Sequence, residues 1–70
     1  MIDGLIDRLK QFCEDETYTY FRDIFDYNFN GYVVEVFETK FLFLDNKLGN
    51  IYVSFSNVKL LTYSDREKGE

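Results

Sequence analysis

Phe41-Leu42-Phe43-Leu44 is the longest uninterrupted apolar block in this sequence of 70 residues, and Asp45 follows it directly. In a strand, successive side chains point to opposite faces, so the two phenylalanines share one face and the two leucines share the other. Leaving two leucines in water would forgo roughly 3–5 kcal/mol, which is comparable with the whole stability of so small a domain. We therefore expect the leucine face to be covered, either by an N-terminal helix or by a second copy of the chain.

Further strand-like segments lie on both sides of this block. Apolar alternation and many aromatic and β-branched residues predict strands over residues 18–26, 32–37, 41–45, 51–55 and 58–63. In the fourth of these strands, Val53 faces inward and Tyr52 faces outward. Residues 17–27 also fit a helical stripe, but their five aromatic residues and two threonines favour a strand, with Phe21 and Phe25 on one face.

Short polar segments predict the turns that connect these strands. Asn30-Gly31 is a dipeptide that accepts positive φ at both positions, so it predicts a tight hairpin turn before Tyr32. Residues 46–50 predict a second turn, and residues 38–40 predict a polar break between two strands.

An amphipathic helix is predicted over residues 3–14, ahead of the first strand. Its apolar positions recur at spacings of three and four: Ile2, Leu5, Ile6, Leu9, Phe12 and Cys13. Asp3 is the expected N-cap, since its carboxylate can accept a hydrogen bond from the first turn. The helix is expected to end near Cys13 or Glu14, because the acidic run that begins there opposes the helix dipole.

These elements predict a single domain over residues 1–63, followed by a polar tail over residues 64–70 that lies in solvent. The domain is expected to be mainly β with an N-terminal α-helix, and its five antiparallel strands are expected to bend strongly into a small barrel of the Sm-like or SH3-like kind. Bending covers the core and manages the exposed edges better than a small flat sheet does. The alternative is an α+β fold in which the helix packs on a four-stranded antiparallel sheet.

Three segments of the chain have the order and spacing of strands that is typical of a known family of small barrels. They are Gly31-Tyr32-Val33-Val34-Glu35-Val36, Phe41-Leu42-Phe43-Leu44-Asp45 and Ile51-Tyr52-Val53-Ser54-Phe55-Ser56-Asn57-Val58. On these segments, the stretch from Tyr18 to Tyr63 resembles the Sm-like (Lsm) family. The resemblance implies an N-terminal helix, five strongly bent strands and assembly into rings through exposed edge strands.

The sequence departs from this family at the residues that contact RNA. Sm-like proteins that bind RNA resemble one another in an Asp…Asn pair in one loop and an Arg-Gly or Lys-His pair in a later loop. Here the later loop reads Phe55-Ser56-Asn57-Val58, and the first basic residue after it is Lys59. No RNA-contact residue is therefore carried over from the resemblance.

The composition argues against an enzyme, a metal site or a bound cofactor. The chain has no histidine, which is the commonest general base and metal ligand. Its single cysteine, Cys13, lies on the apolar stripe of the helix and is expected to be a buried structural residue. The run Glu14-Asp15-Glu16 is interpreted as a solvated acidic turn, because consecutive residues at a helix end splay apart. We expect no catalytic residue, no cofactor, no metal and no small-molecule substrate.

The expected location is the cytoplasm. No apolar run approaches the ~20 residues that span a bilayer, and the first residues lack the positive region of a signal peptide. A lone thiol suits a reducing compartment. We therefore expect a cytoplasmic protein that does not associate with membranes.

Aromatic residues are the main candidates for partner contacts, since they make up 20% of the chain and cannot all be core in so small a domain. The candidates are Tyr18, Tyr20, Tyr27, Tyr52 and Tyr63. The resulting hypothesis is an interaction module that forms a homo-oligomer through edge strands and presents these rings to a protein or RNA. A net charge of −5 gives RNA less support than protein, because binding phosphates requires basic side chains.

The alternative hypothesis is a small acidic inhibitor, of the kind that phages and mobile elements encode, that occupies a basic nucleic-acid-binding surface of a host protein. The chain has thirteen acidic residues and eight basic ones, and this acidic excess motivates the hypothesis. The candidate acidic face comprises Glu14, Asp15, Glu16, Asp23, Asp26, Glu35 and Glu38. This hypothesis requires the seven carboxylates to gather on one face of the fold.

Overall fold

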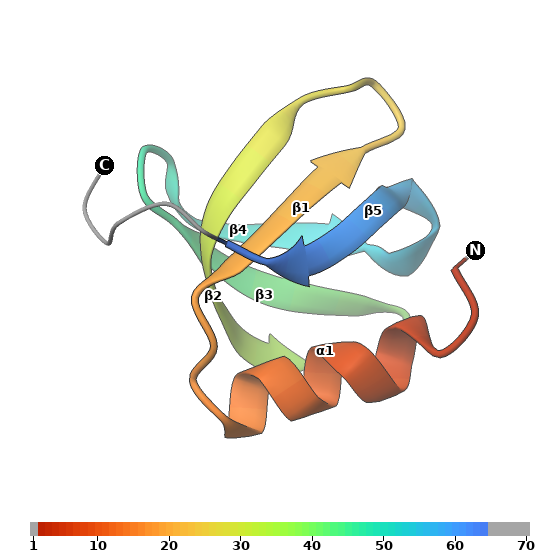
Figure 1. Cartoon of the computed structure of the whole chain (residues 1–70). Coiled ribbons are helices and arrows are strands. Elements are labelled where there is room, and N and C mark those ends of the chain that lie inside the picture. Colours follow the sequence, from red (N-terminus) through yellow and green to blue (C-terminus); the bar gives the residue numbers. More distant parts are fainter. Residues whose placement is uncertain (1, 65–70) are drawn as a thin grey trace.

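A computed structural model of the chain describes residues 2–64 and folds them into one helix and five strands (Figure 1). The elements are α1 (Leu5–Glu14), β1 (Thr19–Asp23), β2 (Asn28–Val36), β3 (Lys40–Asp45), β4 (Gly49–Ser54) and β5 (Val58–Tyr63). A short 3-10 turn, Phe55–Asn57, links β4 to β5. The predicted class, mainly β with an N-terminal helix, is confirmed, and residues 17–27 contain a strand rather than a helix.

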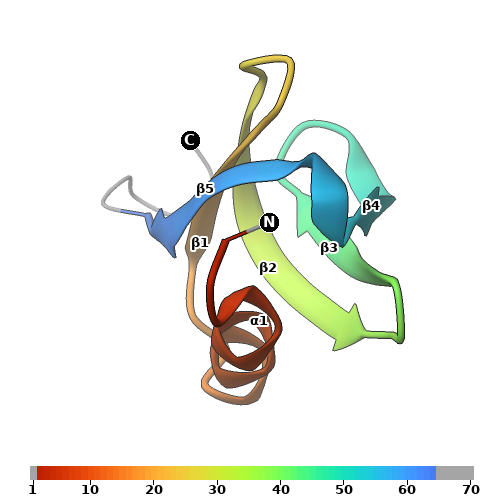
Figure 2. The same ribbon diagram turned by 90° about the vertical axis from the view of Figure 1, so that its right-hand side faces the viewer.

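All five strands belong to one antiparallel sheet, in the order β4-β3-β2-β1-β5. The alternative with a four-stranded sheet is therefore wrong. β2 is the longest strand and curves strongly along its length (Figure 2). Among residues 2–64, β4 and β5 each pair with one neighbour and not with each other, so the sheet is open at both edges and is not closed into a barrel.

Phenylalanine rings fill the core on the inner face of this sheet. Phe21 of β1 stacks on Phe29 with ring centroids 4.6 Å apart and meets Phe43 edge-to-face at 4.8 Å. Phe41, which shares a face of β3 with Phe43, is fully buried and stacks against Phe55 at 6.2 Å. The prediction that the two phenylalanines of β3 share one face is confirmed, and that face is the core.

The helix covers the phenylalanine face of β3 rather than its leucine face. Leu5 and Leu9, four residues apart on the apolar stripe, are buried in the same cluster as Phe41 and Phe43. α1 packs against β2 and lies across one end of the sheet (Figure 1). The expectation that this helix covers the leucines is therefore wrong, because the helix seals the inner side of the bent sheet, where the larger phenylalanines close-pack.

The helix begins in a different way from the prediction. Its N-cap is Gly4, with a φ of 72°, and no side chain caps the first turn, so Asp3 is not the cap. A residue without a Cβ enters this left-handed conformation at low cost, and a hydrogen bond from the Leu5 N–H to the Ile2 carbonyl closes the turn at 3.1 Å. At the other end, α1 stops at Glu14, as the sequence predicts.

Asn30 and Gly31 lie inside β2, so the prediction of a hairpin turn at this dipeptide is wrong. A Cβ built on Gly31 would overlap the carbonyl oxygen of Leu44 on the neighbouring strand. The glycine is therefore explained by the close approach of two strands, and not by a turn that needs positive φ. The chain reverses earlier, through residues 24–27, because β1 ends at Asp23 instead of residue 26.

The turn between β3 and β4 forms where the sequence predicts one, and Asp45 fixes its conformation. The Asp45 side chain is buried and accepts hydrogen bonds from the main-chain N–H groups of Lys47 and Leu48, at 2.9 and 3.0 Å. It also accepts one from the N–H of Asn30 at 3.3 Å. These bonds satisfy a buried carboxylate and tie the turn to β2.

The polar C-terminal segment begins inside the fold. Ser64, the first residue of the predicted tail, donates its N–H to the Tyr18 carbonyl at 2.7 Å and its hydroxyl to the Asn30 side-chain oxygen at 2.9 Å. β5 itself ends at Tyr63, and Ser64 adds hydrogen bonds to the segments beside it. The rest of the predicted tail, residues 65–70, lies outside the described residues.

Candidate functional site

Three large apolar side chains gather on the turn between β1 and β2, residues 24–27. Phe25 and Tyr27 expose 68% and 66% of their surface, and Ile24 exposes about half. The sequence alternation places Phe25 beside the buried Phe21 in a strand, which is wrong because the strand ends two residues earlier. A cluster of large apolar side chains on one exposed turn is typical of a contact surface.

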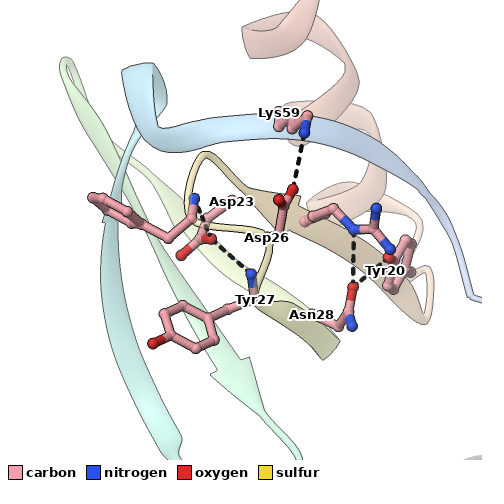
Figure 3. Close-up of polar contacts among 8 residues, drawn as sticks. Tyr20, Asp23, Asp26, Tyr27, Asn28 and Lys59 are labelled. Carbon is pink, nitrogen blue, oxygen red and sulfur yellow. Dashed lines mark hydrogen bonds and ion pairs between the residues drawn. The ribbon is translucent and has the colours of Figure 1, made fainter.

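The Asp23 side chain holds this turn in one conformation (Figure 3). Its Oδ1 atom accepts hydrogen bonds from the main-chain N–H groups of Phe25 and Tyr27, both at 2.9 Å. The main chain of Asp23 adds two more bonds, since its N–H donates to the Tyr27 carbonyl and its carbonyl accepts from the Asp26 N–H, both at 3.0 Å. The exposed rings are therefore carried on a pre-organised turn, which lowers the entropy cost of binding.

A salt bridge joins the same turn to β5. Lys59 Nζ lies 2.9 Å from Asp26 Oδ1, and both side chains are more than half exposed. The hydrogen bond and the charge of Lys59 lower the pKa of the Asp26 carboxyl below its ordinary value. A main-chain bond of 2.9 Å from the Ile24 N–H to the Asn57 carbonyl adds a second link. The turn is thus anchored to β5 and to the 3-10 turn as well as to its own strands.

Tyr20 lies on the other side of this hairpin, and its hydroxyl is engaged. It donates to the Asn28 side-chain oxygen at 2.6 Å, and the same oxygen accepts from Arg22 Nε at 3.1 Å. In Figure 3, Tyr20 and Asn28 lie on the opposite side of the hairpin from the Tyr27 ring. Tyr20 therefore stabilises the hairpin and is less available for a partner than Tyr27.

An open cavity of about 350 Å³ lies between the β1–β2 turn and the β3–β4 turn. Its lining residues are Tyr27, Asn28, Phe29, Asp45, Lys47 and Leu48. Most of the lining surface is apolar, and Leu48 exposes about two thirds of its side chain. The volume lies at the small end of the range of protein ligand sites, so it suits a single large side chain.

A second apolar surface is the outer face of the sheet, defined by Tyr32, Leu42, Leu44 and Tyr52. The strand register places Leu42 opposite Tyr52 and Leu44 opposite Tyr32. Leu44 exposes 43% of its surface and Tyr52 exposes 63%, while Leu42 is half-buried. The Nζ atom of Lys40 lies 4.6 Å from the centroid of the Tyr52 ring. Within residues 2–64, no element fully covers this outer face.

The five candidate tyrosines fall into two groups. Tyr18 is buried, its hydroxyl accepts a hydrogen bond from the Asn46 amide, and its ring centroid lies 5.4 Å from that of Tyr32. Tyr20 is half-buried. The exposed group is Tyr27, Tyr52 and Tyr63. The exposed rings come from three separate elements: the β1–β2 turn, β4 and the end of β5.

The seven candidate carboxylates lie on several elements. Glu14, Asp15 and Glu16 are at the end of α1, Asp23 and Asp26 are at the β1–β2 turn, Glu35 is in β2 and Glu38 is in the turn after it. Asp23 and Glu35 lie near opposite ends of β2, whose nine residues span roughly 25 Å. The seven carboxylates therefore do not form one compact cluster.

Cys13 is half-buried rather than buried, and its thiol donates a hydrogen bond of 3.3 Å to the Val34 carbonyl. This contact ties α1 to β2, which is a structural role. Among residues 2–64, no group of three or more His, Cys, Asp or Glu side chains is arranged to hold a metal ion.

Sequence reasoning missed three residues of these surfaces: Ile24, Phe25 and Leu48. Two signals pointed to them. Asp is favoured at the first position of a β-turn, where its side chain bonds to the main chain two residues later, and Asp23 occupies that position. Leu48 is a large apolar residue inside an otherwise polar turn, where burial does not account for it.

No protein-family model, curated protein or solved structure matches this chain. In the part of the chain that the structure describes, no helix is both long enough and apolar enough to cross a membrane.

Proposed function

We propose that this chain is a non-enzymatic interaction module, resembling the small barrels of the Sm-like family, that self-associates through edge strands and presents an aromatic surface to a protein partner. The observation that supports this most is the apolar outer face, which reaches an open edge of the sheet at Tyr52 of β4. An exposed edge strand beside exposed apolar side chains is a template for pairing with another chain.

The open edge of β4 offers main-chain hydrogen-bonding groups. A hydrogen bond from the Phe55 N–H to the Thr39 carbonyl identifies which residue pairs between β3 and β4 are hydrogen-bonded to each other. Bonded pairs alternate with unbonded pairs in an antiparallel ladder, so Asn50 and Tyr52 direct their N–H and C=O groups to the open side. A second chain can pair with these groups without disturbing β3.

The open edge of β5 offers a matching set. The hydrogen bond from the Ser64 N–H to the Tyr18 carbonyl makes that pair a bonded one. Bonded and unbonded pairs alternate along the ladder, so the main-chain groups of Leu61 face the open side. Leu61 points its side chain into the core, so Leu60 points outward and is about half exposed. Pairing of β4 with β5 of a second copy would therefore join Tyr52 and Leu60 on one continuous outer face.

The incomplete cover of the leucine face supports self-association. The helix occupies the inner side of the sheet, which leaves a second copy as the remaining expected cover for Leu42 and Leu44. Association of folded chains stabilises them by mass action, which matters most for a domain with a small core. The proposal also includes a likeness to small barrels in the bending of the sheet, which the strong curve of β2 supports, and a cytoplasmic location, which the single free thiol supports.

A protein partner is favoured over RNA because two of the cationic side chains are already engaged. Lys59 pairs with Asp26, and Lys40 lies against the Tyr52 ring. The acidic-inhibitor hypothesis loses support because the carboxylates are spread over several elements, and Asp23 is committed to holding its own turn.

Sedimentation equilibrium at tens of micromolar tests the proposal. We expect an average mass above that of one chain, and we expect Asn50→Pro to shift it to the monomer, since proline removes an N–H that faces the open edge of β4. Asn50→Ala is the matched control and should leave the mass unchanged. Circular dichroism checks that both variants fold. A wild-type chain that is monomeric under these conditions would overturn self-association.

A further inference from the structure

We infer that the cavity between the β1–β2 and β3–β4 turns binds an extended peptide segment of a partner protein, which places one large apolar side chain in the cavity and a carboxylate beside Lys47. The inference rests on the interaction-module part of the proposed function and is independent of self-association. It requires three features at one place: apolar walls, an unpaired stretch of main chain and an unpaired cation.

The apolar walls are carried on hydrogen-bonded main chain. Phe29 forms the side of the cavity nearest the core, where it stacks on Phe21 with ring centroids 4.6 Å apart. The Tyr27 main chain is held by two hydrogen bonds with Asp23: its N–H donates to the Asp23 carboxylate, and its carbonyl accepts from the Asp23 N–H. Leu48 lies on the facing turn, and its main-chain N–H donates a hydrogen bond to the Asp45 carboxylate. A side chain that enters this space therefore meets two turns whose main chain is already ordered, which lowers the entropy cost of binding.

The main chain of Asn28 supplies the hydrogen-bonding edge. The bond between the Asp23 N–H and the Tyr27 carbonyl makes that pair a bonded one, so Asn28 and Asn30 direct their main-chain groups away from β1. The Asn30 carbonyl meets the Asn46 N–H there, at 2.9 Å. β3 has ended by this point, and Asn28 lines the cavity with no main-chain partner on that side among residues 2–64.

A peptide that pairs with Asn28 would continue the line of β3 along β2. Main-chain pairing of this kind gives affinity, and the alternation of side chains along the peptide sends one of them into the adjacent pocket. The length of free edge is short, so the apolar anchor carries the selectivity. These features fit an extended polypeptide and not a folded nucleic acid.

Charge selects the residue beside the anchor. Lys47 lines the cavity and has no ion-pair partner among residues 2–64. The nearby Asp45 carboxylate is occupied by three main-chain N–H groups. A carboxylate on the peptide therefore meets an unpaired cation, whereas a cation placed at the same position would be repelled by Lys47.

Selection from a displayed library of random short peptides on the immobilised full chain tests this site. We expect the enriched peptides to share one large apolar residue with an Asp or Glu close to it. Synthetic copies of the enriched peptides should shift the amide resonances of Asn28, Lys47 and Leu48. Methylation of the peptide nitrogen that pairs with Asn28 should weaken binding about fivefold, as expected for the loss of one hydrogen bond.

Two variants and one control separate the site from the rest of the surface. Leu48→Ser should weaken binding about tenfold through lost apolar contact, and Lys47→Glu should weaken it and reduce its dependence on salt. Both side chains are exposed, so the fold should persist, which circular dichroism checks. Tyr63→Ser removes a ring as exposed as Tyr27 but on β5, and it should leave binding unchanged.

Three results would overturn the inference: no enrichment over the Leu48→Ser chain, peptides that bind Leu48→Ser and the wild type equally, or displacement of the peptide by single-stranded oligouridylate. A wild-type chain that binds no peptide but sediments above the mass of one chain overturns this site alone. Peptide binding by a chain that sediments as a monomer overturns self-association alone.

Discussion

The main chain of Gly31 on β2 passes so close to the Leu44 carbonyl on β3 that a Cβ at position 31 would overlap it. Both partners of the contact are main chain, in the central pair of strands, and neither can move without disturbing the ladder. The long, curved β2 depends on this close approach at the point where it leaves the β1–β2 hairpin and enters the centre of the sheet.

Gly31→Ala should therefore destabilise the protein by about 3 kcal/mol, at the upper end of the cost of overpacking. Urea unfolding followed by circular dichroism measures the change. Gly49→Asn is the matched control: Gly49 has a φ of 77°, a Cβ there meets nothing within 4 Å, and asparagine tolerates this conformation. Losses of equal size at the two positions would contradict the close-approach explanation.

Asp23→Ala should loosen the β1–β2 turn, because the main-chain N–H groups of Phe25 and Tyr27 lose their acceptor. We expect a loss of about 1 kcal/mol in unfolding free energy and faster amide hydrogen exchange at those two residues. Asp23→Asn keeps a side-chain oxygen and should retain most of the protection. Unchanged exchange in the alanine variant would show that the turn is held by other contacts.

The Asp26 carboxyl should titrate below its ordinary pKa of 3.8, because Lys59 donates to it and stabilises its charged form. A carboxyl whose pKa is lowered in the folded state adds stability above its unfolded pKa, and this contribution is lost as the pH falls through the folded pKa. The effect is small because the pair is exposed and screened by solvent. Carbon-13 NMR titration measures the pKa, and Lys59→Met should raise it towards the ordinary value.

The two faces of β3 should respond very differently to truncation. Phe43→Ala removes a fully buried ring and should cost about 3–5 kcal/mol in unfolding free energy. Leu44→Ala removes a side chain that is nearly half exposed and should cost less than about 1 kcal/mol in dilute solution. Urea unfolding measures both. A cost at position 44 as large as that at position 43 would mean that the outer face is buried within a single chain.

Features set by local sequence were predictable here. The helical stripe that includes Leu5 and Leu9, and the split of β3 into a phenylalanine face and a leucine face, follow from side-chain period alone. The inward Val53 and outward Tyr52 of β4 follow in the same way, and the structure confirms them.

Features set by contacts between distant segments were not predictable. Asn30-Gly31 has the composition of a turn, but Gly31 is needed for a contact with a strand that comes later in the sequence. The side of β3 that the helix covers depends on the direction in which the sheet bends, which no local pattern states. For the candidate site, Tyr18 and Tyr27 look equivalent in sequence, yet one is buried beside Asn46 and the other projects from a turn.

Within the described residues 2–64, the two unpaired edges belong to different strands, and this difference gives any assembly built on them a polarity. Each contact pairs the β4 edge of one copy with the β5 edge of the next, and the copy that joins leaves its other edge free. Growth therefore stops when the contacts close into a ring or when a copy with a defective edge is added. A small fraction of chains carrying Asn50→Pro would then act as terminators, and the mean size of mixed assemblies would fall as their share rises.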